Sequence, residues 1–180
     1  TNEIAQTESF IGHKWCNFWF HVLHLNTNSG KMSKSKGEFL TVSLLEEKGY
    51  NPLAYRFFCL QSHYRKQLVF SYENLDGAAT AYDKLLKKIA TLKENEGDEL
   101  DMDAVEKLTA SFKAALDNDI NTSLAVTAVY DVLKAKTNDK TKLYLLNDFD
   151  RVLSLDLIEG AKKLSEKADD GEKDELSLYV

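Results

Sequence analysis

Residues 71–92 read SYENLDGAATAYDKLLKKIATL, and their apolar residues recur at intervals of three and four. At that period, side chains line up along one side of an α-helix. Ser71 precedes the pattern with a hydroxyl that can cap the first helical turn. The stretch therefore predicts an amphipathic helix whose apolar stripe must be covered by other helices. The stripe comprises Leu75, Ala78, Ala79, Tyr82, Leu85, Leu86 and Ile89.

Three later segments repeat this pattern and predict three more helices. Asp103 opens an acidic variant of the capping box, so we expect the second helix to begin there. Asn121 or Thr122 caps a third helix that runs to about Lys136, and the fourth covers about residues 140–155. Amphipathic helices joined by short connections are typical of an antiparallel bundle.

The first seventy residues differ from the rest in charge. They carry 8 Lys and Arg against 5 Asp and Glu, a net of +3, whereas the remaining residues carry 15 against 24, a net of −9. Aromatic residues crowd positions 15–25. Trp15 and Trp19 lie four residues apart there, and we expect both in the core.

The pattern of this first part is mixed rather than helical throughout. Residues 15–25 are interpreted as a helix end running into a strand. We expect a returning strand at 39–42, a short helix at 44–48, and a helix at 53–62 whose first turn holds Pro52. The N-terminal part is therefore expected to be a small α/β unit.

The composition limits the classes of protein to which the chain can belong. The 180-residue chain is 43% hydrophobic, has a formal net charge of −6, and contains no apolar run approaching the roughly 18–20 residues that span a bilayer. Cys16 and Cys59 form no CxxC pair, so we expect reduced thiols in a cytoplasmic protein with no membrane partner. Asp117, Asp119 and Asn121 lack the terminal glutamate of a calcium loop, and we expect them to serve loop structure and helix capping.

A lysine-rich loop, GKMSKSKGEF at residues 30–39, concentrates positive charge in a net-acidic chain. Lysine carries a compact charge on a long side chain, which suits phosphate oxygens without demanding a fixed geometry. Gly37 allows the backbone to approach a ligand closely. The pattern favours a polyphosphate whose charge changes during a reaction. Such loops are also common as solvated surface, so the loop by itself leaves both interpretations open.

Residues 31–35, KMSKS, reproduce the signature of class I aminoacyl-tRNA synthetases. The flanks narrow the likeness to one family. TNEIAQ (1–6), the tryptophan-rich stretch before KMSKS, HYRKQLVFSYENL (63–75) and DNDINT (117–122) each resemble segments of cysteinyl-tRNA synthetases, in the same order. The chain thus resembles a fragment of this family that covers the KMSKS region and the helical anticodon-binding domain, over about residues 1–158.

The resemblance implies an ATP site at the lysine-rich loop. In the family, KMSKS closes over ATP, bound with Mg²⁺, and stabilises the triphosphate while the cysteine carboxylate attacks the α-phosphate. Lys34 and Lys31 are then the catalytic residues. Lys36 lies outside the signature, and we expect it to be solvated surface. The ATP-binding residues implied are Lys31, Met32, Ser33, Lys34, Ser35, His24 and Leu25.

The resemblance also implies a metal ion and an RNA partner. Glu3 matches a zinc ligand of the family, whose Zn²⁺ binds the thiolate of the substrate cysteine. The other ligands of the family have no counterpart in this sequence, so we expect the ion to be absent from this chain alone. His63, Tyr64 and Arg65 are candidates for binding tRNA-Cys, or else for bracing the junction between the two parts of the chain.

Together these observations predict a mainly α-helical protein in four parts. Residues 1–22 are the C-terminal remnant of a Rossmann-type catalytic domain, and residues 23–70 are a small α/β stem-contact unit with the KMSKS loop. Residues 71–160 form the helical-bundle tRNA-binding domain, and residues 161–180 are a charged tail or the start of a further segment. We expect this fragment to be inactive alone.

The function implied is that of an ATP-dependent cysteine–tRNA ligase, which is expected to be a monomer and uses cysteine, ATP and tRNA-Cys. Two other interpretations stay open. One is a cysteine ligase of thiol biosynthesis, which shares the zinc site and KMSKS but joins cysteine to an amino sugar. The other is a non-catalytic helical module that binds RNA or a protein. The net charge of −9 after residue 70 argues that the bundle alone binds a polyanion weakly.

Overall fold

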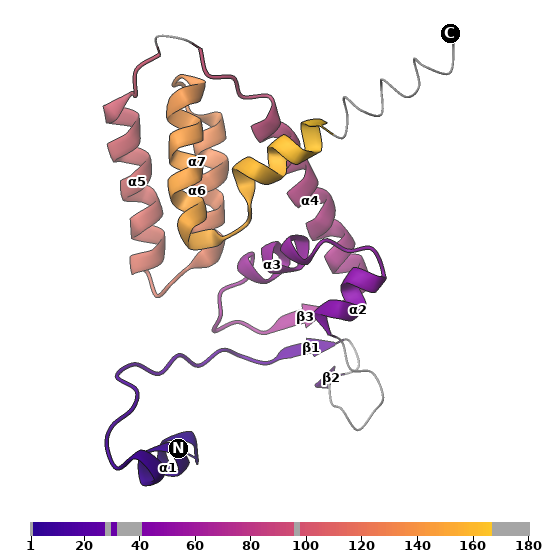
Figure 1. Ribbon diagram of the computed structural model, residues 1–180, viewed down its shortest axis with the longest axis vertical. Coiled ribbons are helices and arrows are strands. Elements are labelled where there is room, and N and C mark those ends of the chain that lie inside the picture. The colour runs from indigo at the N-terminus through magenta and orange to yellow at the C-terminus, as the bar shows by residue number, and fades with distance from the viewer. Residues whose placement is uncertain (1, 28–29, 32–40, 96–97, 167–180) are drawn as a thin grey trace.

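The computed structural model describes residues 2–27, 30–31, 41–95 and 98–166. Helices dominate it, and a small sheet lies at one end of the helical part (Figure 1). This confirms the predicted mainly helical fold, with an α/β unit ahead of a bundle. No described helix is long and apolar enough to cross a membrane. The labelled elements are α1 (Asn2–Ile11), β1 (Leu25–Thr27), β2 (Gly30–Lys31), α2 (Val42–Glu47), α3 (Pro52–Leu60), β3 (Leu68–Phe70), α4 (Tyr72–Ala90), α5 (Met102–Asp117), α6 (Thr122–Lys134) and α7 (Asp139–Leu153).

The helices pack around one continuous apolar core. α5, α6 and α7 lie against one another and alternate in direction (Figure 1). Phe112 of α5 stacks on Phe149 of α7 with ring centroids 4.1 Å apart. α4 packs chiefly on α3, where the rings of Tyr82 and Phe57 are 5.8 Å apart. The bundle and α3 therefore form one packed body.

Capping side chains set where the bundle helices begin. The Ser71 hydroxyl accepts a hydrogen bond from the backbone N–H of Asn74 at 3.0 Å, as predicted for the start of α4. The Asn121 side chain accepts one from Leu124 at 3.2 Å at the start of α6, which confirms the first of the two predicted caps. Each cap satisfies a backbone donor that the first helical turn leaves unpaired.

The predicted start of α5 at Asp103 is wrong. Asp101 caps this helix instead, accepting a hydrogen bond from the backbone N–H of Ala104 at 3.1 Å. The Thr137 hydroxyl donates to the same carboxylate at 2.9 Å, and the N–H of Asp101 donates to the Thr141 hydroxyl at 2.9 Å. A contact with the distant turn before α7 therefore selects the cap, and a local sequence pattern does not reveal such a contact.

A further helix at 157–166, unlabelled in Figure 1, packs back beside α4. The Asp150 carboxylate holds the turn before it, accepting hydrogen bonds from the N–H groups of Leu155 at 2.6 Å and Leu157 at 2.9 Å. Leu155, Leu157 and Ala161 are buried. The helix therefore contributes to the core of the bundle.

The sheet has the strand order β2-β1-β3. β1 pairs antiparallel with β2, with Asn26 opposite Lys31, and parallel with β3, with Asn26 opposite Val69. β3 was not predictable from the sequence, because three residues are too few to display a period of two. β1 is the central strand, so its position depends on the segment that contains β3.

The predicted returning strand at 39–42 is wrong at its described end. Val42 is the first residue of α2, and the Thr41 hydroxyl caps that helix by accepting from Leu44 at 3.1 Å. Residues 39 and 40 lie outside the described part of the chain. No helix end lies within residues 15–25 either, because regular structure there begins only with β1.

The N-terminal arm, residues 2–24, leaves large apolar side chains on the surface. α1 buries none of its residues, and Phe10 and Phe18 are 91% and 90% exposed. Trp15 and Trp19 are 46% and 39% exposed and meet each other edge-on at 5.4 Å. The prediction that they lie in the core is wrong, because within the described residues the bundle core does not extend to them.

Candidate functional site

The KMSKS segment begins at the edge of the sheet. Lys31 lies in β2, opposite Asn26 of the central strand. Met32, Ser33, Lys34 and Ser35 lie outside the described residues, so their predicted roles in ATP binding stay predictions. The strand pairing nevertheless makes β1 the element whose position sets where the signature begins.

His24 and Leu25, predicted to lie near the adenine base, stand at the start of β1. His24 is exposed, whereas Leu25 is half-buried and lines a cavity of about 380 Å³. Burial raises the pKa of Tyr55 in this cavity to about 12 and also raises the pKa of the free Cys59 thiol, so both groups stay neutral. Such walls suit an apolar group better than a phosphate. The lining includes Phe20, Leu23, Tyr55, Cys59, Leu60 and Ile120.

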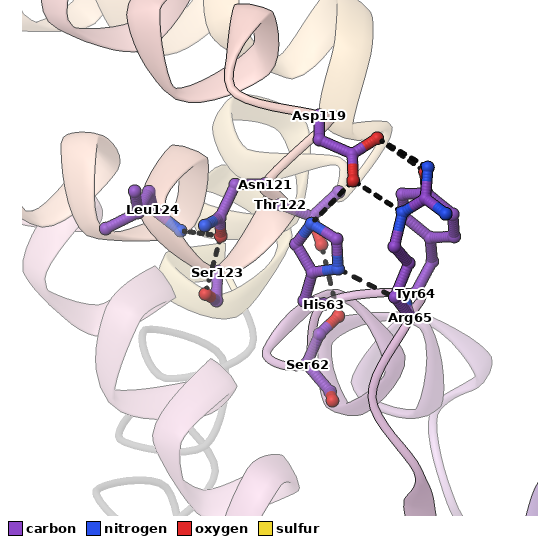
Figure 2. Close-up of polar contacts among 9 residues, drawn as sticks. All are labelled: Ser62, His63, Tyr64, Arg65, Asp119, Asn121, Thr122, Ser123 and Leu124. Atoms are coloured by element: carbon purple, nitrogen blue, oxygen red, sulfur yellow. Dashed lines mark hydrogen bonds and ion pairs between the residues drawn. The ribbon is translucent and has the colours of Figure 1, made fainter. Parts of the chain in front are cut away.

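His63, Tyr64 and Arg65, between α3 and β3, converge on Asp119 in the turn between α5 and α6 (Figure 2). Arg65 donates from Nε to Oδ2 of Asp119 at 2.6 Å and from Nη2 to Oδ1 at 3.2 Å. The Tyr64 hydroxyl donates to Oδ1 at 2.5 Å, and Nε2 of His63 lies 3.8 Å from Oδ2. We call these four residues the Asp119 cluster. Its contacts join the segment between α3 and β3 to the turn between α5 and α6, and tRNA binding by these residues stays a prediction.

Aromatic rings extend the Asp119 cluster across the junction. The Arg65 guanidinium lies over the Tyr64 ring at 5.0 Å, and this ring packs on His63 at 4.8 Å and on Phe20 of the N-terminal arm at 4.2 Å. The side chains of Arg65 and Asp119 are 64% and 46% exposed. A guanidinium stacked on an aromatic ring at an open surface is a common contact for RNA bases and phosphates.

The charges in the Asp119 cluster offset each other. Hydrogen bonds from Arg65 and then Tyr64 lower the pKa of Asp119 to about 2. The same bonds to Asp119 raise the pKa of Tyr64 and of Arg65. Near neutral pH the carboxylate and the guanidinium are therefore both charged and paired. An anionic ligand that approaches Arg65 has to compete with Asp119.

Sequence reasoning missed the contact made by Asp119, to which it gave only a loop role. The Arg65–Asp119 bond joins residues 54 positions apart. In the sequence, HYR and DNDINT both resemble segments of one family. That resemblance does not predict a contact between the two segments. Asn121 caps α6, as expected for this stretch.

Glu3 lies in the first turn of α1 and is exposed. Among the residues that the structure describes, no three His, Cys, Asp or Glu side chains gather closely enough to hold a metal ion. The described residues therefore do not form a zinc site by themselves, and Glu3 supplies at most one ligand of such a site.

Comparison with known proteins agrees with the signature and its surroundings. Residues 1–80 match the family model described as the tRNA synthetases class I (C) catalytic domain. The cysteine–tRNA ligase of Novosphingobium aromaticivorans is 41% identical over 170 residues, which is 88% of this chain and 34% of that protein. Those of Borreliella burgdorferi and Brevibacillus brevis are 33% and 36% identical, over 88% and 93% of this chain and 35% and 40% of their own lengths.

Residues 1–80 are therefore similar to the catalytic domain of class I aminoacyl-tRNA synthetases, and Lys31, the first residue of the KMSKS signature, lies at the edge of a small sheet. Over 88–93% of its length the chain is similar to cysteine–tRNA ligases, as the sequence resemblance predicted. It spans about a third of the length of the curated relatives it matches.

Proposed function

We propose that this chain supplies the ATP loop and the tRNA-binding helices of a cysteine–tRNA ligase. The observation that carries the proposal is the match to such ligases over 88% of the chain, together with an intact KMSKS signature. The reaction joins cysteine to AMP with release of pyrophosphate, and then transfers the cysteinyl group to tRNA-Cys. The free thiols of Cys16 and Cys59 support a cytoplasmic setting, in which we expect a monomer.

The signature lysines carry the proposed chemistry of activation. Negative charge accumulates on the β- and γ-phosphates as the bond to the α-phosphorus breaks. Ammonium groups on Lys31 and Lys34 would stabilise that charge, and Mg²⁺ would supply further positive charge to the triphosphate. Met32, Ser33 and Ser35 are the other signature residues that we propose for ATP binding. Glu3 provides one ligand to a Zn²⁺ that would hold the thiolate of the substrate.

The bundle and the Asp119 cluster provide the proposed RNA surface. Arg65 is exposed and flanked by Tyr64 and His63. At the other end of the bundle, a recess of about 420 Å³ is lined by Lys88, Lys134 and Lys142, and also by Asp139, which pairs with Lys142 at 3.2 Å. Phosphates bind best where cations gather locally, and the three lysines that line the recess outnumber its one carboxylate. The turn between α5 and α6 and the C-terminal end of α6 lie at opposite ends of the bundle, a separation that suits a long ligand (Figure 1).

A chimera tests the proposal. This chain replaces the matching segment of the Novosphingobium aromaticivorans cysteine–tRNA ligase, and the control is that enzyme with the segment deleted. We expect the chimera, and not the control, to exchange pyrophosphate into ATP when cysteine is present and to charge tRNA-Cys. Equal inactivity of the two proteins would contradict the proposal. Exchange followed by transfer to an amino sugar, without charging of tRNA, would favour a ligase of thiol biosynthesis.

A further inference from the structure

Tyr64 receives contacts from three parts of the chain that meet at the junction. Its hydroxyl donates to Asp119 of the α5–α6 turn at 2.5 Å. Its backbone carbonyl accepts from the N–H of Leu23 at 3.0 Å, two residues before β1. Its ring packs on Phe20 of the N-terminal arm at 4.2 Å. A single residue therefore links the bundle to the segment that enters the central strand.

We propose that Asp119 is a positioning residue, which acts through Tyr64 and Arg65 to fix β1, and with it the start of the KMSKS segment, relative to the bundle. This inference rests on the proposed function in so far as it concerns catalysis. Asp119 touches no reacting atom in this scheme. It sets where the sheet stands relative to the bundle.

The backbone at Asp119 supports a dedicated role for this turn. Asp119 and Ile120 both have positive φ, 55° and 53°. That region is unfavourable for residues with a Cβ atom, and most of all for a β-branched residue such as Ile120. Such strain persists only where the surroundings hold it. Here the carboxylate of Asp119 is held by Arg65 and Tyr64, and the side chain of Ile120 lines the cavity beside Leu23.

A second bond ties the same turn to the end of α3. The Thr122 hydroxyl donates to the carbonyl of Ser62 at 3.3 Å (Figure 2). The Thr122–Ser62 bond and the Arg65–Asp119 bond hold the two ends of the segment from Ser62 to Arg65, which then runs into β3. Because β3 pairs in parallel with β1, the turn between α5 and α6 controls the central strand from two sides.

The geometry also shows how RNA could act on the sheet. Arg65 shares its donors with Asp119, so a phosphate that binds Arg65 weakens the pair. The Tyr64–Asp119 bond and the Leu23–Tyr64 bond then relax together, and the position of β1 responds. Asp119 thereby couples occupancy of the junction to the loop that would hold ATP.

Amide hydrogen exchange in the 180-residue chain tests the positioning role directly. Asp119→Asn removes the charge, and Asp117→Asn is the matched control, because Asp117 is exposed two residues earlier. We expect Asp119→Asn to speed exchange at Leu23 and in β1 on the order of tenfold, the effect of losing one charge-assisted hydrogen bond. Exchange rates at Leu23 and in β1 should stay at the parent value in the Asp117→Asn control, and rates in the core of α7 should be unchanged in both variants. Asp119→Glu should restore part of the protection at Leu23 and in β1.

Equal exchange in the Asp119 and Asp117 variants would overturn the proposal. A uniform loss of protection that reaches α7 would indicate that the contact serves overall stability only. Tyr64→Phe guards against misfolding of the first variant, because it removes only the hydroxyl that donates to Asp119. If Tyr64→Phe leaves the Leu23 amide protected, or lowers protection in α7 as much as at Leu23, the positioning role is wrong.

The chimera provides the catalytic readout. We expect Asp119→Asn to lower kcat for cysteine-dependent pyrophosphate exchange while KM for cysteine stays the same, with partial rescue by Asp119→Glu. An unchanged kcat would contradict the coupling to the ATP loop. If the chimera with an unchanged Asp119 is itself inactive, the proposed function is contradicted instead. Amide hydrogen exchange in the 180-residue chain would still decide whether Asp119 positions β1.

Discussion

At the scale of single residues, the Asp119 cluster is the most connected polar feature of the junction. One carboxylate accepts hydrogen bonds from Arg65 and Tyr64 and faces His63. All of these groups remain partly open to water, so solvent and salt weaken each contact on its own. The cluster therefore contributes orientation more than stability.

The ionisation of Asp119 gives a pH prediction. Its pKa is about 2 in the folded chain against an ordinary value of 3.8, because Arg65 and Tyr64 favour the charged form. Since the folded value is the lower one, the contribution of the pair is fully present above about pH 4 and is lost as the pH falls through 2. NMR titration of the Arg65 side-chain N–H should show a midpoint near 2. In an Arg65→Met variant, the pKa of Asp119 should rise towards its ordinary value but stay below it, because the Tyr64 hydroxyl still donates to the carboxylate, and an unchanged midpoint would contradict the pairing.

A buried phenol gives a stability prediction. Tyr82 is 1% exposed, and its hydroxyl donates to the Leu155 carbonyl at 2.5 Å. Tyr82→Phe leaves that carbonyl without its partner and should cost about 1 to 2 kcal/mol of unfolding free energy. Urea denaturation measures the change. Tyr144→Phe is the control, because Tyr144 is 49% exposed and its loss should cost less than about 0.5 kcal/mol.

The sequence could indicate the residue types of the site but not its partners. HYR was readable as a basic and aromatic cluster, and KMSKS as a phosphate loop. The acceptor Asp119 lies in a sequence typical of a polar turn, and only the fold brings it next to Arg65. Likewise, the tryptophan spacing suggested a core, whereas burial depends on which other elements lie against the arm.

At the scale of elements, the helices of the bundle were predictable because each carries an apolar stripe and a capping residue. α4, α6 and α7 begin at or within about one residue of their predicted starts. The sheet was harder to predict, because β1, β2 and β3 are each three residues or shorter. Such strands are selected by pairing with one another rather than by their own pattern.

The cap of α6 gives a prediction at this scale. The Asn121 side chain accepts from the N–H of Leu124 and from the Ser123 hydroxyl. Asn121→Ala should lower the unfolding free energy by about 1 kcal/mol, because the first turn of α6 loses its partner. Ser111→Ala, at an exposed position inside α5, should change it little. Equal urea midpoints for the two variants would contradict the capping role.

The lysine recess gives a prediction about RNA. Lys88 at the end of α4 and Lys134 at the end of α6 line the same recess. If each contacts one phosphate, the double change to Ala should weaken binding of tRNA-Cys and reduce the slope of log affinity against log salt by about 2. Lys113→Ala, on the exposed face of α5, is the control. An unchanged slope in the double variant would remove the recess from the RNA surface.

At the scale of the whole molecule, the charge and the exposed apolar surface divide the chain into two regions. The bundle has a well-packed core, whereas the N-terminal arm exposes Phe10 and Phe18 almost fully. Residues 1–80 match a catalytic domain model, yet the chain spans about a third of its relatives. We therefore expect the isolated chain to fold without catalysing pyrophosphate exchange.

The most direct test of the account is the exchange of pyrophosphate into ATP by the chimera when Lys34 is changed to Ala. Lys36→Ala is the matched control, because Lys36 stands two residues further on and outside the signature. We predict that Lys34→Ala lowers the cysteine-dependent exchange rate on the order of 10²- to 10³-fold, as expected when a group that stabilises developing charge is removed. The rate of the Lys36 variant should stay close to that of the parent. Full exchange activity in the Lys34 variant would contradict the account.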